Sequence, residues 1–230
     1  MATTVEFPSN GHQASGYLAT PASGSGPGVL VIQEWWGLDA GIKEWTDRLG
    51  AAGFVALAPD LYHGELAEHT EMDKAGKLMQ GLPPDRAARD MSGAVDYLAG
   101  HKAVTSKGIG VVGFCMGGML SFIIGANRGD KVKALVPFYG FPQGAMEPDW
   151  SKLTAVVRGH MAEHDNFFAP AAAGALEKKL RAMGKDVTLT VHPGTGHAFM
   201  GPHNALGTLD KEASARIWPE VVTFLKDTLR

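Results

Sequence analysis

Residues 108–127 read GIGVVGFCMGGMLSFIIGAN, and this stretch decides the fold class. It contains no Asp, Glu, Lys or Arg, and it is long enough to raise the question of a membrane span. Its six glycines and the strand-like run Ile109–Val112 favour a buried strand that is followed by a buried helix. We therefore expect this segment to lie in a protein core and the protein to have no membrane partner.

The remainder of the chain repeats this alternation of strand and helix. Buried strands are predicted at 28–33, 54–58, 108–112, 134–138, 154–158 and 187–192, and helices at 39–52, 68–80, 84–99, 116–127, 169–183 and 211–229. Such alternation predicts a mostly parallel sheet with helices on both faces. Two short strands at 3–8 and 14–20, joined by Ser9-Asn10-Gly11, predict an antiparallel N-terminal hairpin. We expect a single α/β domain over residues 1–230.

The composition is typical of a globular protein. The chain has 230 residues, of which 45% are hydrophobic and 20% charged, so disorder is excluded for most of it. The net charge of −3 gives no basic field for nucleic acid. The single cysteine can form neither an internal disulfide nor a Cys-based zinc site. The first Lys or Arg is Lys43, so the basic start of a secretory signal is missing, and we expect a cytoplasmic location.

Cys115 is the predicted nucleophile. Gly113-Phe-Cys115-Met-Gly117 fits the pattern Gly-x-nucleophile-x-Gly, with cysteine in the position usually held by serine. In this motif the nucleophile lies on a sharp strand-to-helix turn, where side chains two residues away on either side would clash. The positive end of the following helix favours a thiolate over a thiol. A buried core thiol is the alternative, and the two glycines, the strand and the helix all argue against it.

His197 and Asp165 are the predicted partners of Cys115. Hydrolases with this motif carry the nucleophile, the acid and the histidine in that order along the chain. His197 follows the last predicted strand, in Gly194-Thr-Gly-His197, and Asp165 follows the preceding strand. The spacing His160-x-x-x-His164-Asp165 lacks the Glu of a zinc-protease helix, so no metal is predicted.

Glu34 ends the first buried strand at the edge of the sheet where the nucleophile turn is expected. Its carboxylate either forms a structural ion pair with an arginine or controls the protonation state of the Cys115 thiol. The loop that it begins supplies one oxyanion donor in this kind of hydrolase. We therefore predict the backbone N–H groups of Trp35 and Met116 as the oxyanion hole.

Four segments together resemble the dienelactone hydrolase (carboxymethylenebutenolidase) family of the α/β-hydrolase fold, from Val29 to the last helix. They are Gln33-Glu34-x-x-Gly37, Pro59-Asp-Leu-Tyr62, Gly113-Phe-Cys-Met-Gly-Gly118 and Gly196-His-Ala-Phe199. The resemblance implies a Cys115, Asp165 and His197 triad and hydrolysis of a lactone or ester through an acyl-cysteine. It also implies that Glu34 accepts the thiol proton once substrate displaces it, that no metal or organic cofactor is needed, and that the protein is a monomer.

The resemblance implies two arginines that hold a substrate carboxylate, and this chain departs from that pattern. Residues 198–202 contain no arginine, and residues 71–73 read Glu-Met-Asp. Lys74, Arg86 and Arg89 remain as substitutes. An unpaired carboxylate binds poorly in an apolar pocket, so we expect a neutral ester or lactone. The predicted lining residues are Trp36, Tyr139, Phe199 and Met200.

Three alternatives stay open at this point. The first is a generalist esterase that carries cysteine in place of serine. The second is a catalytically silent α/β-hydrolase that binds a small ligand, and the third is a thiol redox sensor. The last has no second cysteine to resolve an oxidised thiol.

Overall fold

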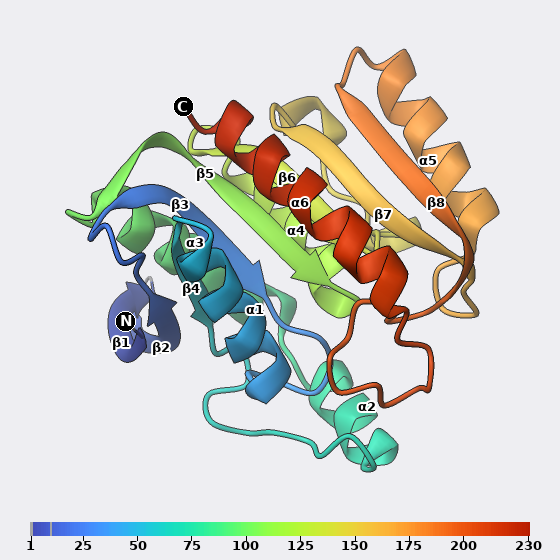
Figure 1. Ribbon diagram of the computed structural model, residues 1–230, viewed down its shortest axis with the longest axis horizontal. Coiled ribbons are helices and arrows are strands. Elements are labelled where there is room, and N and C mark those ends of the chain that lie inside the picture. The colour runs from blue at the N-terminus through green and yellow to red at the C-terminus, as the bar shows by residue number, and fades with distance from the viewer. Residues whose placement is uncertain (1, 10) are drawn as a thin grey trace.

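An eight-stranded sheet forms the centre of the computed structural model, which describes residues 2–9 and 11–230 (Figure 1). The strands are β1 (Ala2–Ser9), β2 (His12–Ala19), β3 (Gly26–Ile32), β4 (Val55–Pro59), β5 (Val104–Phe114), β6 (Val132–Phe138), β7 (Val156–His164) and β8 (Val187–Gly196). Their order in the sheet is β1-β2-β4-β3-β5-β6-β7-β8. The first two pairings, β1 with β2 and β2 with β4, are antiparallel, and all the others are parallel. The predicted sheet and N-terminal hairpin are confirmed, while Asn10 of the predicted turn lies outside the described residues.

Helices cover both faces of the sheet, as predicted. They are α1 (Ala40–Ala51), α2 (Met72–Gln80), α3 (Pro84–Gly100), α4 (Met116–Asn127), α5 (Pro170–Ala182) and α6 (Lys211–Thr228). Two short 3-10 helices span Gly144–Met146 and Trp150–Lys152. In Figure 1, α1 and α6 lie in front of the sheet, and α3 and α4 lie behind it. The helix predicted from residue 68 begins at Met72, because residues 68–71 form a turn in which the Glu71 amide donates to the Glu68 carbonyl (2.8 Å).

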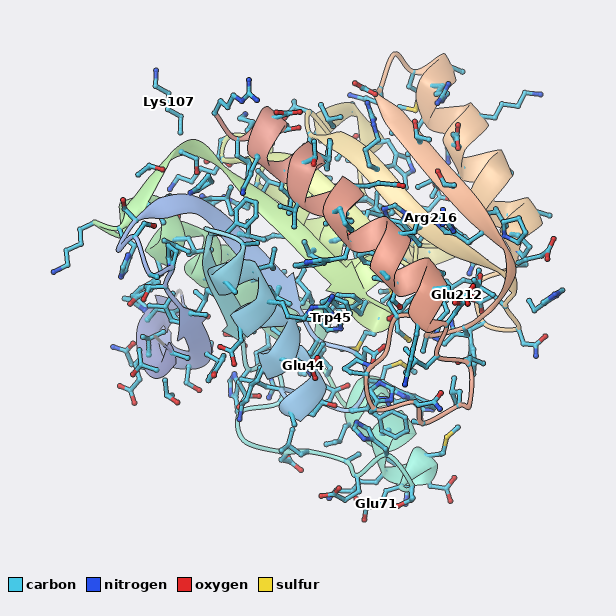
Figure 2. All side chains as sticks on the ribbon, in the orientation of Figure 1. Glu44, Trp45, Glu71, Lys107, Glu212 and Arg216 are labelled. Atoms are coloured by element: carbon cyan, nitrogen blue, oxygen red, sulfur yellow. The ribbon has the colours of Figure 1, made fainter. Side chains whose placement is uncertain are left out.

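The charge-free stretch 108–127 is buried because both faces of β5 are covered. Ile109 and Val111 point into the core under α3, α4 and α5, whereas Val112 and Phe114 point into the core under α1 and α6. Trp45 of α1 lies in the core under α1 and α6 and stacks on Phe114, with ring centroids 5.2 Å apart (Figure 2). Such a doubly covered strand reads as a continuous apolar run. Among the described residues, no helix combines the length and the apolar character needed to cross a membrane.

The last two strands extend beyond their predicted ends and position the site. The predictions ended at Arg158 and His192, but β7 and β8 continue to pair until His164 lies opposite Gly196. The residue after each strand therefore emerges at the same edge of the sheet. Those two residues are Asp165 and His197.

Candidate active site

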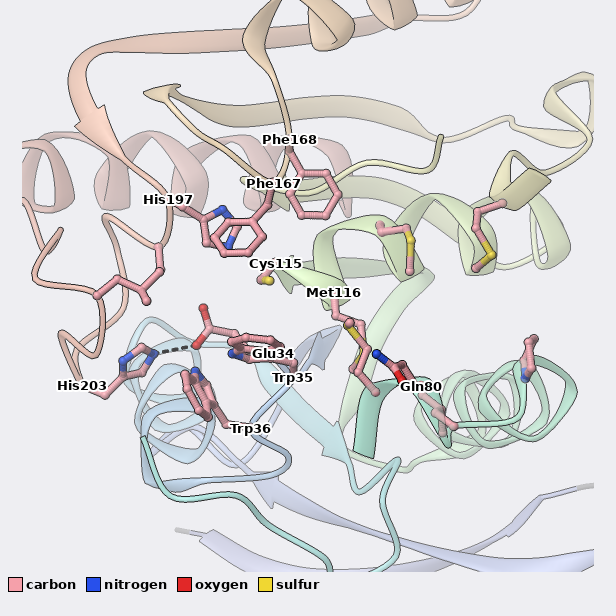
Figure 3. A pocket seen from close by; sticks show the side chains of 17 residues that line it. Glu34, Trp35, Trp36, Gln80, Cys115, Met116, Phe167, Phe168, His197 and His203 are labelled. Atoms are coloured by element: carbon pink, nitrogen blue, oxygen red, sulfur yellow. Dashed lines mark hydrogen bonds and ion pairs between the residues drawn. The ribbon is translucent and has the colours of Figure 1, made fainter. Parts of the chain in front are cut away.

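Cys115 lies on the strained turn that the glycine pattern predicted. Its backbone has φ 54° and ψ −115° between β5 and α4, a conformation that non-glycine residues rarely adopt. A Cβ on Gly113 would lie 2.0 Å from the Gly117 carbonyl oxygen, and a Cβ on Gly117 would lie 2.3 Å from the Ile32 carbonyl oxygen. Both positions therefore require glycine for the turn to close. Figure 3 shows the Cys115 side chain pointing into the space between His197 and Glu34.

His197 and Asp165 form a direct pair. The His197 Nδ1 lies 2.8 Å from Asp165 Oδ2, and both side chains are almost fully buried. The other carboxylate oxygen, Oδ1, accepts hydrogen bonds from the amides of Phe167 (2.8 Å) and Phe168 (2.9 Å). Because the carboxylate only accepts, Nδ1 carries the imidazole proton and Nε2 is left as a base.

The resting Cys115 is a thiol, although its position at the end of the helix favours a thiolate. Burial raises the pKa of Cys115 far above its usual range, and the charge of Glu34 raises it further. The Met116 amide at the start of α4 acts in the opposite direction but is outweighed. Among the described residues, no hydrogen bond joins Cys115 Sγ to His197 or Glu34. The helix end therefore acts in the predicted direction, but burial and Glu34 outweigh it.

Glu34 is paired with a histidine rather than with an arginine. Its Oε2 lies 2.6 Å from His203 Nε2, and the two side chains are about 5% exposed. Burial lowers the pKa of His203, but the hydrogen bond and charge of Glu34, with the charge of Asp39, raise it overall. The Ala205 amide donates to His203 Nδ1 (3.0 Å), so Nε2 carries a proton and donates to Glu34. The second carboxylate oxygen, Oε1, is buried and has no hydrogen-bond partner among the described residues.

His203 and His69, which packs against it, were not predicted from the sequence. The rings of His69 and His203 pack together with centroids 4.2 Å apart, and His69 Nε2 lies 2.7 Å from Asp39 Oδ2. His203 occurs six residues after His197, directly beyond the arginine-free residues 198–202. The signal for it in the sequence is a second histidine in the loop that carries His197.

Cys115, His197 and Glu34 open onto an apolar pocket of about 530 Å³ (Figure 3). The pocket is lined by Glu34, Trp35, Trp36, Met79, Gln80, Leu82, Pro84, Cys115, Met116, Met119, Met146, Phe167, Phe168, His197, Ala198, His203 and Leu206. None of these residues is an arginine or a lysine. The proposed substitutes are engaged elsewhere: Lys74 lies 3.5 Å from Glu71, and Arg89 lies 2.6 Å from Asp85. Arg86 donates to the Leu61 carbonyl (3.3 Å).

Of the four predicted lining residues, Trp36 lines the pocket and the other three lie behind it. Tyr139 and Phe199 are fully buried and Met200 is 1% exposed, because all three belong to the core under α1 and α6. The Tyr139 ring makes an edge contact with His197 (centroids 5.2 Å apart). Burial and the charge of the neighbouring Glu34 raise the pKa of Tyr139, so its hydroxyl stays protonated. These side chains therefore pack behind His197 rather than line the pocket.

A mostly parallel sheet, whose central strand passes through a strained nucleophile turn into a helix, defines an α/β-hydrolase. The sequence comparisons make this class more specific. The profile of the Dienelactone hydrolase family matches residues 14–229, and the chain belongs to that family.

Individual proteins agree with the family match. "Protein usf" of Aquifex pyrophilus is 37% identical over 235 residues, with all of both chains covered. The carboxymethylenebutenolidase of Pseudomonas putida is 28% identical over 202 residues, covering 83% of this chain and 82% of its own. A solved dienelactone hydrolase-like phosphotriesterase from metagenomic libraries superposes with a TM-score of 0.83 at 23% identity, covering 100% of this chain and 99% of its own. The chain is therefore a carboxylic ester hydrolase, and the catalytically silent alternative is set aside.

Proposed function

We propose that this enzyme hydrolyses neutral carboxylic esters or lactones through an acyl intermediate on Cys115. The observation that carries the proposal is the composition of the pocket. It holds the Cys115 thiol, the His197 imidazole and the Glu34 carboxylate, but no lysine or arginine that could bind an anionic substrate.

Glu34 is the proposed acceptor of the thiol proton. Its Oε2 is held by His203, and its buried Oε1 has no hydrogen-bond partner among the described residues, so it is free to accept a proton. A substrate carbonyl that fills the pocket excludes water and brings the thiol and the carboxylate together. The proton moves from Cys115 Sγ to Glu34 Oε1, and the thiolate attacks the carbonyl carbon.

Two backbone amides are the proposed donors to the resulting oxyanion. The Met116 N–H lies at the first turn of α4 and already interacts with Cys115 Sγ. The Trp35 N–H donates no hydrogen bond among the described residues, so it is available to donate to the oxyanion. Donors at these two places stabilise negative charge that appears only in the transition state.

His197 is the proposed base of the second half-reaction. When the tetrahedral intermediate collapses, the carbon–oxygen bond to the leaving group breaks, and the alkoxide takes the proton held by Glu34. His197 Nε2 then removes a proton from water, which attacks the acyl-cysteine carbonyl. The carbon–sulfur bond breaks, the acid leaves, and the imidazolium returns its proton to the thiolate. Asp165 stabilises that imidazolium through Nδ1.

The pocket supports a neutral substrate with an apolar acyl or alcohol group. Met79, Met146 and Phe167 are exposed at its rim, and flexible methionines adapt to ligands of varied shape. A carboxylate in this pocket would be desolvated beside Glu34 without a positive partner. Burial of an unpaired charge costs several kcal/mol, which favours neutral substrates.

The test compares two matched esters, 4-nitrophenyl butyrate and 4-nitrophenyl hemisuccinate, which differ by a terminal carboxylate. We expect kcat/KM to be at least about 100-fold higher for the butyrate, because the carboxylate must be desolvated. Met79→Arg adds a cation at the rim and should recover part of the lost activity on the hemisuccinate. Equal kcat/KM for the two esters would contradict the neutral-substrate assignment.

The same assay tests the acyl-cysteine. The intact mass of wild-type enzyme mixed rapidly with the butyrate ester should show one added acyl group, and Cys115→Ala should show neither the adduct nor hydrolysis. Hydrolysis by Cys115→Ala at the wild-type rate would place the nucleophile elsewhere.

A further inference from the structure

We propose that His12, His63 and Asp90 form a binding site for a divalent transition-metal ion, separate from the active site. The three residues come from three parts of the fold. His12 is the first residue of β2, His63 lies in the loop that follows β4, and Asp90 is in α3. None of them lines the catalytic pocket.

The three side chains converge on one point. His12 Nε2 lies 2.9 Å from Asp90 Oδ1, and His63 Nε2 lies 2.8 Å from Asp90 Oδ2. The ligand atoms of all three lie within 4.8 Å of one another. Zinc–ligand bonds are about 2.0–2.2 Å for imidazole nitrogen and carboxylate oxygen, so a small outward movement of the two rings makes room for an ion. Two imidazoles and one carboxylate suit Zn²⁺ and its transition-metal neighbours rather than Mg²⁺ or Ca²⁺.

The charge balance at Asp90 also favours a cation. Asp90 is fully buried, and its partners among the described residues are the two histidines and the Ser9 hydroxyl (2.5 Å). No described lysine or arginine forms an ion pair with it. A buried carboxylate needs a compensating positive charge, and a bound divalent ion supplies one while both imidazoles stay neutral.

The site is accessible, and an ion there would link separate segments. The His12 and His63 side chains are 33% and 34% exposed, so an ion can enter from solvent without unfolding. It would join the N-terminal hairpin to α3 and to the loop after β4. That loop also carries Tyr62, whose hydroxyl contacts Met116 Sδ (3.6 Å) beside the nucleophile. We therefore infer a stabilising role for the ion.

Glutamine substitutions distinguish a metal site from a cluster that is only hydrogen-bonded. The same distances fit two imidazole N–H groups that donate to Asp90. A glutamine side-chain amide can replace each of these donors, but it is a poor zinc ligand. The double variant His12→Gln/His63→Gln therefore keeps the hydrogen bonds and removes the proposed ligands. His164→Gln, which changes an exposed histidine elsewhere, is the matched control.

The experiment titrates the full-length Cys115→Ser protein with ZnCl₂ by calorimetry, so that the active-site thiol cannot bind zinc, and follows thermal unfolding. We expect one ion per chain and a rise in Tm of about 5–10 °C at 100 times the Kd. The His164→Gln control should behave in the same way. The double glutamine variant should unfold at the metal-free Tm, lose more than about 100-fold in zinc affinity, and show no rise. Absence of zinc binding, or zinc affinity unchanged in the double variant, would show that the cluster is hydrogen-bonded only and would overturn the proposal.

Discussion

Two imidazole–carboxylate pairs flank Cys115, and they are built in opposite ways. In the first pair Asp165 holds Nδ1 of His197, and the other ring nitrogen is left for chemistry. In the second pair Nε2 of His203 holds Oε2 of Glu34, and the other carboxylate oxygen is left for chemistry. In the proposed mechanism, the same two functional groups therefore give an oriented base in one place and an oriented acid–base carboxylate in the other.

The difference between the pairs is set by the backbone contacts around each one. Two amides satisfy Asp165 Oδ1, so this carboxylate has no remaining role except to hold His197. One amide, from Ala205, occupies Nδ1 of His203, so this imidazole has no remaining role except to hold Glu34. In the proposed mechanism, these backbone N–H groups thus decide which member of each pair reacts.

The largest expected effect is the loss of the His197 imidazole, and the same substitution at His203 provides the comparison between the two pairs. His197→Gln removes the base and should lower kcat on 4-nitrophenyl butyrate by about 1000-fold or more. His203→Gln keeps an N–H that can donate to Glu34 and should leave kcat within about 3-fold of wild type.

His203→Leu provides the control for this comparison. It removes the donor, so kcat should fall about 10-fold. Equal losses in His203→Gln and His203→Leu would show that the ring itself, rather than its hydrogen bond, supports the reaction.

Glu34→Gln is expected to have a smaller effect on activity, and it should lower the acylation rate while raising the alkylation rate of Cys115. Loss of the proton acceptor should slow acylation about 100-fold. Loss of the negative charge should lower the pKa of Cys115, because Glu34 is one cause of its elevation. Iodoacetamide should therefore alkylate Cys115 in the variant faster than in wild type at neutral pH, although the variant is the poorer enzyme.

Stopped-flow acylation and alkylation rates measure these two quantities separately. A purely structural Glu34 predicts a different result: thermal stability would fall, while the two rates would stay close to wild type.

The smallest expected effect is on stability, and it comes from two buried imidazoles that contact each other without a carboxylate partner. His160 Nδ1 lies 3.0 Å from His192 Nε2. Burial, then the charge of His192 and of Arg216 (labelled in Figure 2), lowers the pKa of His160 from 6.5 to about 3. Burial and Arg216 lower that of His192 from 6.5 to about 4. Without a carboxylate, a buried histidine stays neutral.

The free energy of unfolding should therefore fall on acidification. Below pH 6.5 both histidines bind protons in the unfolded chain, whereas in the native protein His192 binds one only near pH 4 and His160 only near pH 3. The free energy of unfolding therefore falls as the pH falls through that window. At pH 5 the loss from His160 is about 2 kcal/mol. Urea unfolding at pH 7 and pH 5 measures it, and His160→Asn/His192→Gln should reduce the difference. An unchanged difference in the double variant would assign the pH dependence to other groups.

The parts of the site that depend on short-range sterics or chain order could be predicted from the sequence. Gly113 and Gly117 are required by clashes within a few residues of Cys115, so their spacing alone located the turn. His197 and Asp165 each follow directly on a strand, and the order of the strands along the chain placed them at one edge of the sheet.

The remaining features depend on contacts that no local pattern encodes. Glu34 and His203 are 169 residues apart and meet through an irregular loop. Tyr139 and Phe199 were placed near the site correctly but on the wrong side of it. Tyr139 (φ 36°) and Ala198 (φ 62°) adopt left-handed backbone conformations, which turn the local chain in a way that periodicity does not predict. The state of the Cys115 thiol depends on burial, which outweighs the helix end.

The protonated resting state of Cys115 has a consequence for the lifetime of the enzyme. Peroxides attack thiolates far faster than thiols, and this chain has no second cysteine through which an oxidised sulfur could be rescued as an internal disulfide. A molecule without substrate therefore keeps its sulfur in the form that resists oxidants. If the proposed mechanism holds, irreversible damage is confined to the part of each cycle in which the sulfur carries charge, so inactivation by oxidants should scale with the number of turnovers rather than with time.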